Sequence, residues 1–172
     1  MSFSQATAAL GLNSPYDPII LAAGARYMVD PALIKAVITK ESSWNPGALR
    51  AEPQIGDASY GLMQLLLRTA QGMQPGVTPS DLFDPNINID LGTRYLAGQL
   101  GQYGYPAGVS AYNAGHPISG NAQYVADVDA GYAWFTQHDT ALGGAGSAPF
   151  PRLGSIEWRD RHQRLAAQPR GR

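Results

Sequence analysis

The stretch DPALIKAVITKESSW, residues 30–44, decides the fold expected for this chain. Asp30 followed by Pro31 is typical of a helix start, because aspartate caps the free amides and proline is tolerated at the first helical position. The apolar residues at positions 34, 37 and 38 then share one stripe of a helix. The next position on that stripe is Glu41, so a carboxylate is expected where the pattern calls for a core residue.

This placement makes Glu41 a candidate general acid. Burial raises the pKa of a carboxyl group, because the charged form loses its hydration. A carboxyl that keeps its proton near neutral pH can donate it to a leaving group. The same spacing allows a plain alternative, in which Glu41 marks an exposed helix end and pairs with Lys40 or Arg50. The spacing alone leaves both interpretations open.

Length and composition indicate one folded domain without disulfides, a membrane span or a metal site. The 172 residues contain no cysteine, which excludes disulfides and thiolate sites, and no apolar run approaches the ~18 residues of a membrane helix. The first residues lack a basic region followed by a long apolar core, so we expect no secretory signal and no membrane span. The histidines share no metal-ligand spacing, so no metal site is expected. They are His116, His138 and His162.

Charge divides the chain into a body and a tail. Residues 1–138 carry six Lys/Arg and ten Asp/Glu, whereas residues 139–172 carry six Arg and three Asp/Glu. The body therefore has no general attraction to nucleic acid, while the tail suits docking to an assembly. A Gly/Ala/Pro-rich linker begins at position 140. We expect a weakly structured arm at 1–16, a domain at 17–138, and a linker with an Arg-rich tail at 139–172.

The domain is predicted to be all-α. Capping residues and apolar spacing predict helices that begin near residues 17, 31, 60, 85, 106 and 121. The helix at 60–74, capped by Asp57 or Ser59, is expected to cross the core, where Gln64 needs a hydrogen-bond partner. Residues 45–59 are predicted to form a long functional loop. No segment sustains two-residue alternation, so no strand is expected.

Three motifs occur on three of these predicted helices: Glu41-Ser42, Gly61-Leu62-Met63-Gln64 and Ala111-Tyr112-Asn113-Ala114-Gly115, with Asp84-Pro85-Asn86-Ile87-Asn88 between the last two. Each motif alone is weak, but the ordered set is specific. Over roughly residues 17–138 the set resembles the lytic transglycosylase domain of the soluble-lytic-transglycosylase (SLT) type. The resemblance implies a lysozyme-like helical fold of the goose type.

The resemblance also implies roles for individual side chains. Glu41 matches the catalytic glutamate, Asn113 the residue that contacts the N-acetyl region, and Tyr124 a tyrosine whose hydroxyl points toward the glutamate. The implied substrate-binding residues are Ser42, Met63, Gln64, Tyr112, Asn113 and Tyr124. Most of them have a plain alternative: Asn113 can be a helix end, and the others apart from Ser42 can be core residues.

The implied reaction is cleavage of the β-1,4 bond between N-acetylmuramic acid and N-acetylglucosamine in peptidoglycan glycan strands, with formation of 1,6-anhydromuramic ends. Most glycosidases need two carboxylates. In the SLT type one glutamate gives the proton to the leaving oxygen and later takes one from the C6 hydroxyl, without metal or cofactor. A catalytically silent glycan-binding module on the same fold is a further alternative.

The loop before the GLMQ motif departs from the family pattern. It reads AEPQIGDAS, which is longer than usual and similar to phage-borne members. Its acids, Glu52 and Asp57, leave open a goose-type-like muramidase in which a second carboxylate activates water. Because cell-wall chemistry is paired with no recognisable export signal, we expect a virion or phage-tail component that acts on the host's periplasm and wall. A secreted effector is the alternative.

Overall fold

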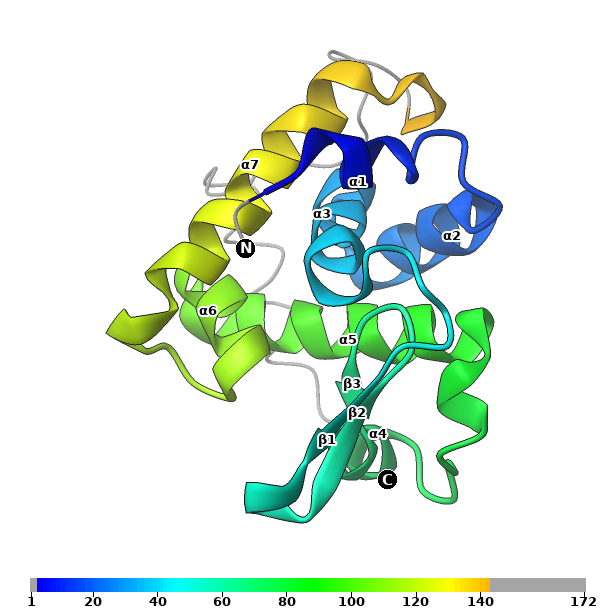
Figure 1. Cartoon of the computed structure of the whole chain (residues 1–172), viewed down its shortest axis with the longest axis vertical. Helices are drawn as coiled ribbons and strands as arrows, with labels where there is room; N and C mark the ends of the chain where they lie inside the picture. Colours follow the sequence, from blue (N-terminus) through cyan, green and yellow to red (C-terminus); the bar gives the residue numbers. More distant parts are fainter. Residues whose placement is uncertain (1–2, 143–172) are drawn as a thin grey trace.

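The computed structural model describes residues 3–142, which are arranged around helix α3 (Figure 1). Helix α3 packs along α7 and against α1 and α2, and α5 lies across the lower end of these helices. The helices are α1 Gln5–Ala9, α2 Asp17–Tyr27, α3 Pro31–Ser42, α4 Leu67–Met73, α5 Pro85–Tyr103, α6 Ala107–Ala114 and α7 Ala122–His138. Short 3-10 turns lie at Pro53–Ile55, Asp81–Phe83, Ser119–Asn121 and Thr140–Leu142.

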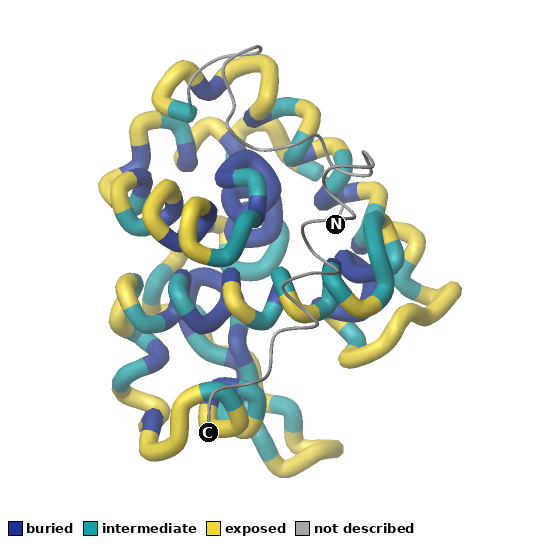
Figure 2. The backbone as a smooth tube through the Cα atoms, turned by 180° about the vertical axis from the view of Figure 1, so that it is seen from behind, coloured by how far each residue is buried: buried dark blue, intermediate teal, exposed yellow. Residues whose placement is uncertain are grey.

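Helix α3 forms where the sequence predicts it. The Asp30 carboxylate accepts a hydrogen bond from the Ala32 amide at 2.9 Å, and Pro31 occupies the first turn. Every residue from 31 to 39 is buried, so α3 is a core helix on all sides (Figure 2). The helix ends at Ser43, whose left-handed φ of 52° closes the last turn.

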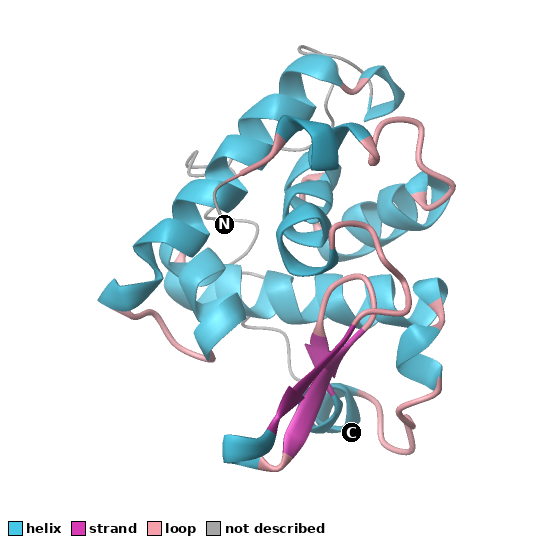
Figure 3. Ribbon diagram, viewed as in Figure 1, coloured by secondary structure: helices cyan, strands magenta, loops and turns pink. Residues whose placement is uncertain are grey.

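A three-stranded antiparallel sheet is the main difference from the expected fold (Figure 3). Strand β1 (Leu49–Glu52) pairs with β2 (Asp57–Tyr60), and β2 pairs with β3 (Leu65–Leu66). Because most of the described chain is helical, the all-α class is confirmed. The prediction that no strand occurs was wrong. The helix predicted over residues 60–74 is confirmed only for α4, because residues 60–66 form strands and a turn instead.

Backbone conformation explains why the GLMQ motif is a turn. Gly61 has a φ of 71°, and a Cβ atom there would lie 2.4 Å from the Leu82 carbonyl oxygen. Gln64 also has a left-handed φ, of 48°. Two such residues within four positions stop helix propagation, and α4 therefore begins only after β3.

The buried side chain of Asn88, on α5, fixes the GLMQ turn through hydrogen bonds. Its amide nitrogen donates to the carbonyl oxygens of Tyr60 and Leu82 at 2.8 and 2.9 Å, and its oxygen accepts from the Met63 amide at 2.8 Å. One side chain thus satisfies backbone groups that a helix would otherwise pair. Asn88 fixes the hairpin onto α5.

The two ends of the described chain meet at a buried cation. Lys35 is completely buried, and its Nζ lies 2.7 Å from Asp17 Oδ1, 2.5 Å from Asp139 Oδ2 and 2.8 Å from the Gly11 carbonyl oxygen. Two carboxylates compensate its charge, as a buried cation requires. Asp139, expected in the linker, is therefore part of the packed body.

The N-terminal arm also differs from expectation, since residues 5–9 form the short helix α1 with Ala8 buried. Within residues 3–142 no helix has the length and apolarity needed to cross a bilayer. The predicted linker and Arg-rich tail lie outside the described residues from position 143 onward.

Candidate active site

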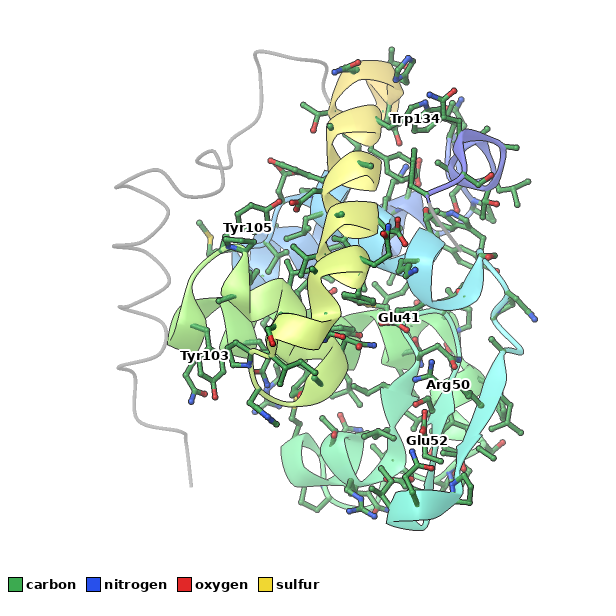
Figure 4. All side chains as sticks on the ribbon, turned by 60° about the vertical axis from the view of Figure 1, so that its left-hand side comes forward. Glu41, Arg50, Glu52, Tyr103, Tyr105 and Trp134 are labelled. Carbon is green, nitrogen blue, oxygen red and sulfur yellow. The ribbon has the colours of Figure 1, made fainter. Side chains whose placement is uncertain are left out.

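A cleft of about 640 Å³ lies between the helices and the hairpin. One wall is helical and includes Glu41 at the end of α3; the other is the β1–β2 hairpin with Arg50 and Glu52. Figure 4 shows these three side chains in a row, with Arg50 between the two glutamates. Further lining residues are Gln64 of the GLMQ turn, Tyr112 and Asn113 of α6, and Gly115 directly after α6.

Glu41 is half-buried, and its carboxyl group binds a proton more tightly than an ordinary glutamate does. Burial raises the pKa of its carboxyl from 4.5 to about 7, against the opposing effects of a hydrogen bond from Tyr124 and the charges of Arg50 and Lys40. The Tyr124 hydroxyl donates to Glu41 Oε1 at 2.6 Å. The carboxyl thus exchanges its proton near neutral pH, which suits a group that acts first as acid and then as base.

Two buried tyrosines form the floor behind Glu41. Burial and the neighbouring Glu41 charge raise the pKa values of Tyr112 and Tyr124 well above the ordinary range, so both hydroxyls keep their protons. Tyr112 uses its proton to bind the Met63 carbonyl oxygen at 2.7 Å, which connects α6 to the GLMQ turn. Tyr124 is left as the donor to Glu41.

Gln64 closes the turn and faces the cleft. Its amide nitrogen donates to the carbonyl oxygens of Ala48 and Gly61 at 3.1 and 3.0 Å. The predicted need for a hydrogen-bond partner is therefore confirmed, although the residue lies in a turn rather than a helix.

The structure separates the predicted site residues into two groups. Glu41, Gln64, Tyr112 and Asn113 line the cleft. The others do not: Ser42 Oγ donates to the Ile38 carbonyl oxygen at 3.2 Å, Met63 is fully buried, and Tyr124 lies buried behind Glu41. Their roles toward substrate stay predictions.

Both acids of the loop, Glu52 and Asp57, accept hydrogen bonds from neighbouring side chains that stabilise their charged forms. Hydrogen bonds from Gln54 and Arg50, each 2.7 Å long, hold the pKa of Glu52 below its ordinary value. Glu52 lines the cleft, whereas Asp57 is not among the described residues that line it.

Asp57 instead links the hairpin to α4. Burial alone raises the pKa of Asp57, but hydrogen bonds from Ala58 and Arg68 bring it below its ordinary value. The Arg68 Nε donates to Asp57 Oδ2 at 3.0 Å. Both loop acids are therefore ionised at neutral pH.

The sequence did not predict that Arg50 lies in the cleft or that Asn88 holds the GLMQ turn. The sequence feature that could have placed Arg50 is a β-hairpin. Two four-residue segments flank positions 53–56, and Gly56, with a φ of 63°, ends the turn between them. Asn88 stood inside a motif but without a stated role. Among the described residues, no group of three His, Cys, Asp or Glu could hold a metal ion.

Comparison with known proteins agrees with this geometry. The membrane-bound lytic murein transglycosylase C of Serratia proteamaculans (strain 568) is 37% identical to this chain over 116 residues, covering 58% of this chain and 31% of that protein. The protein of the same name from Yersinia pestis (strain Pestoides F) is 38% identical over 89 residues, which cover 48% of this chain and 24% of that protein. This chain thus spans less than a third of the length of these relatives.

The 70 kDa soluble lytic transglycosylase SLT70 from Escherichia coli has a similar structure. It superposes with a TM-score of 0.60 at 25% sequence identity, over 78% of this chain and 26% of that one. Residues 18–131, more than half of the present chain, match the family described as Transglycosylase SLT domain. The resemblance inferred from the three motifs is confirmed, and the chain belongs to the Transglycosylase SLT domain family.

Proposed function

We propose that this chain is a peptidoglycan lytic transglycosylase. It cleaves the β-1,4 bond between N-acetylmuramic acid and N-acetylglucosamine and leaves 1,6-anhydromuramic ends. The observation that carries the proposal is Glu41, a cleft-lining carboxyl whose pKa is raised to about 7 by burial. Membership of the SLT family and the names of the relatives support the same reaction.

Glu41 performs both proton transfers in this reaction. It first gives its proton to the glycosidic oxygen as the bond from that oxygen to C1 breaks, and the substrate's N-acetyl group stabilises C1. The Glu41 carboxylate then takes the proton of the C6 hydroxyl, whose oxygen bonds to C1 and closes the anhydro ring. Tyr124 stabilises the intervening carboxylate, because its hydroxyl donates to Glu41 Oε1. Gln64, Tyr112 and Asn113 bind the sugars.

A muramidase that hydrolyses the same bond is the second candidate, because Glu52 also lines the cleft. The geometry favours the single-glutamate reaction, since both Glu52 oxygens are engaged by Arg50 and Gln54. A catalytically silent module is less well supported, because such a module gains nothing from a desolvated, unneutralised acid.

Mass spectrometry of the products released from purified peptidoglycan tests the proposal. We expect muropeptides one water lighter than the hydrolysed sugar. Products with ordinary reducing ends would establish hydrolysis instead, and the absence of any product would favour the silent module.

The biological setting is a further part of the proposal. We place the enzyme in a virion or phage tail, on the strength of the Gly-Asp-containing loop and the Arg-rich residues 139–172. The catalytic domain occupies residues 17–138 with the buried Asp139 packed against it, and the residues from position 143 onward dock it to the assembly. Deleting residues 143–172, which keeps the buried Asp139, should abolish incorporation into particles but not cleavage of peptidoglycan. Incorporation of the truncated chain would contradict the docking role.

A further inference from the structure

Arg50 is the only cationic side chain among the described residues that line the cleft. It lies on β1, between Glu41 and Glu52 in the row visible in Figure 4. Its side chain is 58% exposed, so it is open to a bound molecule. In the proton transfers described above, this group neither gives nor takes a proton.

The hairpin holds Arg50 in one orientation. Its Nε donates to Glu52 Oε1 at 2.7 Å, and the second Glu52 oxygen is fixed by Gln54. The backbone of Arg50 is paired with Ser59 in the sheet. In the described part of the chain, no protein group accepts a hydrogen bond from its two terminal nitrogens.

This arrangement leaves a carboxylate-binding fork in the cleft. A guanidinium group has five N–H donors, and its two terminal amino groups bind one carboxylate through two parallel hydrogen bonds. Because Glu52 occupies only the Nε side, the terminal donors remain available. Neutral sugar hydroxyls and acetamides do not need such a charged fork.

We infer that Arg50 binds a carboxylate of the substituent that muramic acid carries at C3: a carboxylate of the peptide stem where a stem is attached, and the lactyl carboxylate where none is. The inference rests on the proposed function, because that reaction places C1 of muramic acid at Glu41. The C3 substituent belongs to the same sugar ring and so lies within reach of a neighbour of Glu41. Arg50 thereby selects anionic glycan chains over neutral ones.

A different role for Arg50 must be separated from this one. Its positive charge lowers the pKa of Glu41, so any effect that its removal has through proton transfer falls on every substrate alike. Recognition of a carboxylate affects only substrates that carry the carboxylate. Two substrates that differ in this group therefore distinguish the two roles.

The test compares Arg50→Gln with the parent enzyme on two forms of soluble glycan chains. One form carries native peptide stems; in the other, carbodiimide and ammonia have converted the carboxylates to amides. We expect Arg50→Gln to lower kcat/KM about tenfold on native chains, mainly through KM, and less than twofold on amidated chains. Equal losses on both forms, or no loss on either, would overturn the inference.

Arg94→Gln is the matched control. Arg94 is an exposed arginine of α5 that donates to the Met73 carbonyl oxygen and is not among the cleft-lining residues. The Arg94→Gln substitution removes the same charge as Arg50→Gln and should leave kcat/KM unchanged on both substrates. Arg50→Lys, which keeps the charge without the fork, should recover less than half of the lost kcat/KM; full recovery would contradict bidentate binding.

Binding in the Glu41→Gln background keeps this test independent of catalysis. Adding Arg50→Gln there should weaken binding of native chains about tenfold, and the difference should shrink in high salt. In native chains the lactyl carboxyl is amide-bonded to the peptide, and stripping the peptide frees it as a carboxylate. Persistence of the difference on stripped chains shows that Arg50 also binds the lactyl carboxylate, and its disappearance confines the binding to the stem. A parent enzyme that forms no anhydro product refutes the proposed function. Identical binding by Glu41→Gln and by the double variant that also carries Arg50→Gln refutes only the role of Arg50.

Discussion

The helical wall and the hairpin wall of the cleft each present a glutamate, and the two glutamates behave in opposite ways. Glu41, on the helical wall, accepts a hydrogen bond from the neutral hydroxyl of Tyr124, and burial raises its pKa to about 7. Glu52, on the hairpin wall, is held by Gln54 and Arg50, and its pKa is lowered. Surroundings, rather than residue type, assign the proton-exchanging role to Glu41.

This difference follows from how each wall is built. Helix α3 is buried on all sides for most of its length, so its end delivers Glu41 into a poorly hydrated position. Strand β1 is largely exposed, with only Glu52 partly covered, and its charged residues pair with one another. The helical wall supplies a reactive proton, and the hairpin wall supplies fixed charge.

The largest expected effect comes from removing the acid of the helical wall. Glu41→Gln should lower transglycosylase activity by roughly 10²–10⁴-fold, the usual range for loss of a general acid. Folding should be retained, because glutamine is isosteric and can still accept the Tyr124 hydrogen bond. Rates of peptidoglycan clearing, with circular dichroism as the check of folding, measure this effect. Equal clearing by both proteins would remove Glu41 from the mechanism.

Glu41 should also make the domain less stable as the pH rises. Its pKa is 4.5 in the unfolded reference and about 7 in the folded state, so the folded state binds a proton more tightly. The resulting stabilisation is complete below the unfolded pKa and is lost as the pH rises through 7. The loss is about 3 kcal/mol between pH 4.5 and 8.

Urea unfolding at pH 5 and pH 8 checks this linkage. The parent protein should lose stability relative to Glu41→Gln over this interval, because glutamine does not titrate. Glu52→Gln is the control from the other wall: the lowered pKa of Glu52 gives no loss in this interval. Identical pH dependence of the parent and Glu41→Gln would mean that burial does not perturb Glu41.

The helical wall was largely predictable from the sequence because its signals are local. Asp30-Pro31 and Asp84-Pro85 each start a helix at the expected residue, and the side chains of both aspartates cap it. The period of the apolar stripe placed Glu41 at the inner end of α3. These features depend on residues within two turns of one another, which is the range over which sequence patterns are informative.

The hairpin wall was not predicted, because its strands lack an alternating apolar pattern and the hydrogen bonds that fix it come from residues distant in sequence. Strand β1 has three exposed residues and no alternation. The turn after β2 is fixed by Asn88, which lies 25 positions beyond the Met63 amide that it binds. The apolar run after Gly61 fitted a helix equally well, and only tertiary hydrogen bonds decide against one. The position of Arg50 could not be predicted without this hairpin.

A smaller effect is expected from the hydrogen bond behind Glu41. Tyr124→Phe removes a donor that lowers the pKa of Glu41, so that pKa should rise above 7. The rate should fall about tenfold, because the carboxylate formed in the first step loses a charge-assisted hydrogen bond. The descending limb of the pH–rate profile, which reflects ionisation of Glu41, should move to higher pH.

The pH–rate profile of Tyr112→Phe provides the comparison for this shift. Tyr112 is equally aromatic and buried, but its hydroxyl binds the Met63 carbonyl oxygen instead of Glu41. Its loss should leave the descending limb in place, whatever its effect on the rate. Movement of the limb in both variants would show that packing, rather than the Tyr124 hydroxyl, sets the pKa of Glu41.

The smallest effect is expected at the acid of the hairpin wall. Glu52→Gln should lower kcat/KM less than about threefold, because glutamine still accepts from Arg50 and no proton passes through this residue. The products should keep their anhydro ends. If Glu52 instead activated a water, its loss would reduce the rate by at least about 10²-fold and the parent products would carry reducing ends. Asp57→Asn tests the remaining loop acid in the same assay; because Asp57 faces Arg68 outside the cleft, its change should act on stability rather than on the product.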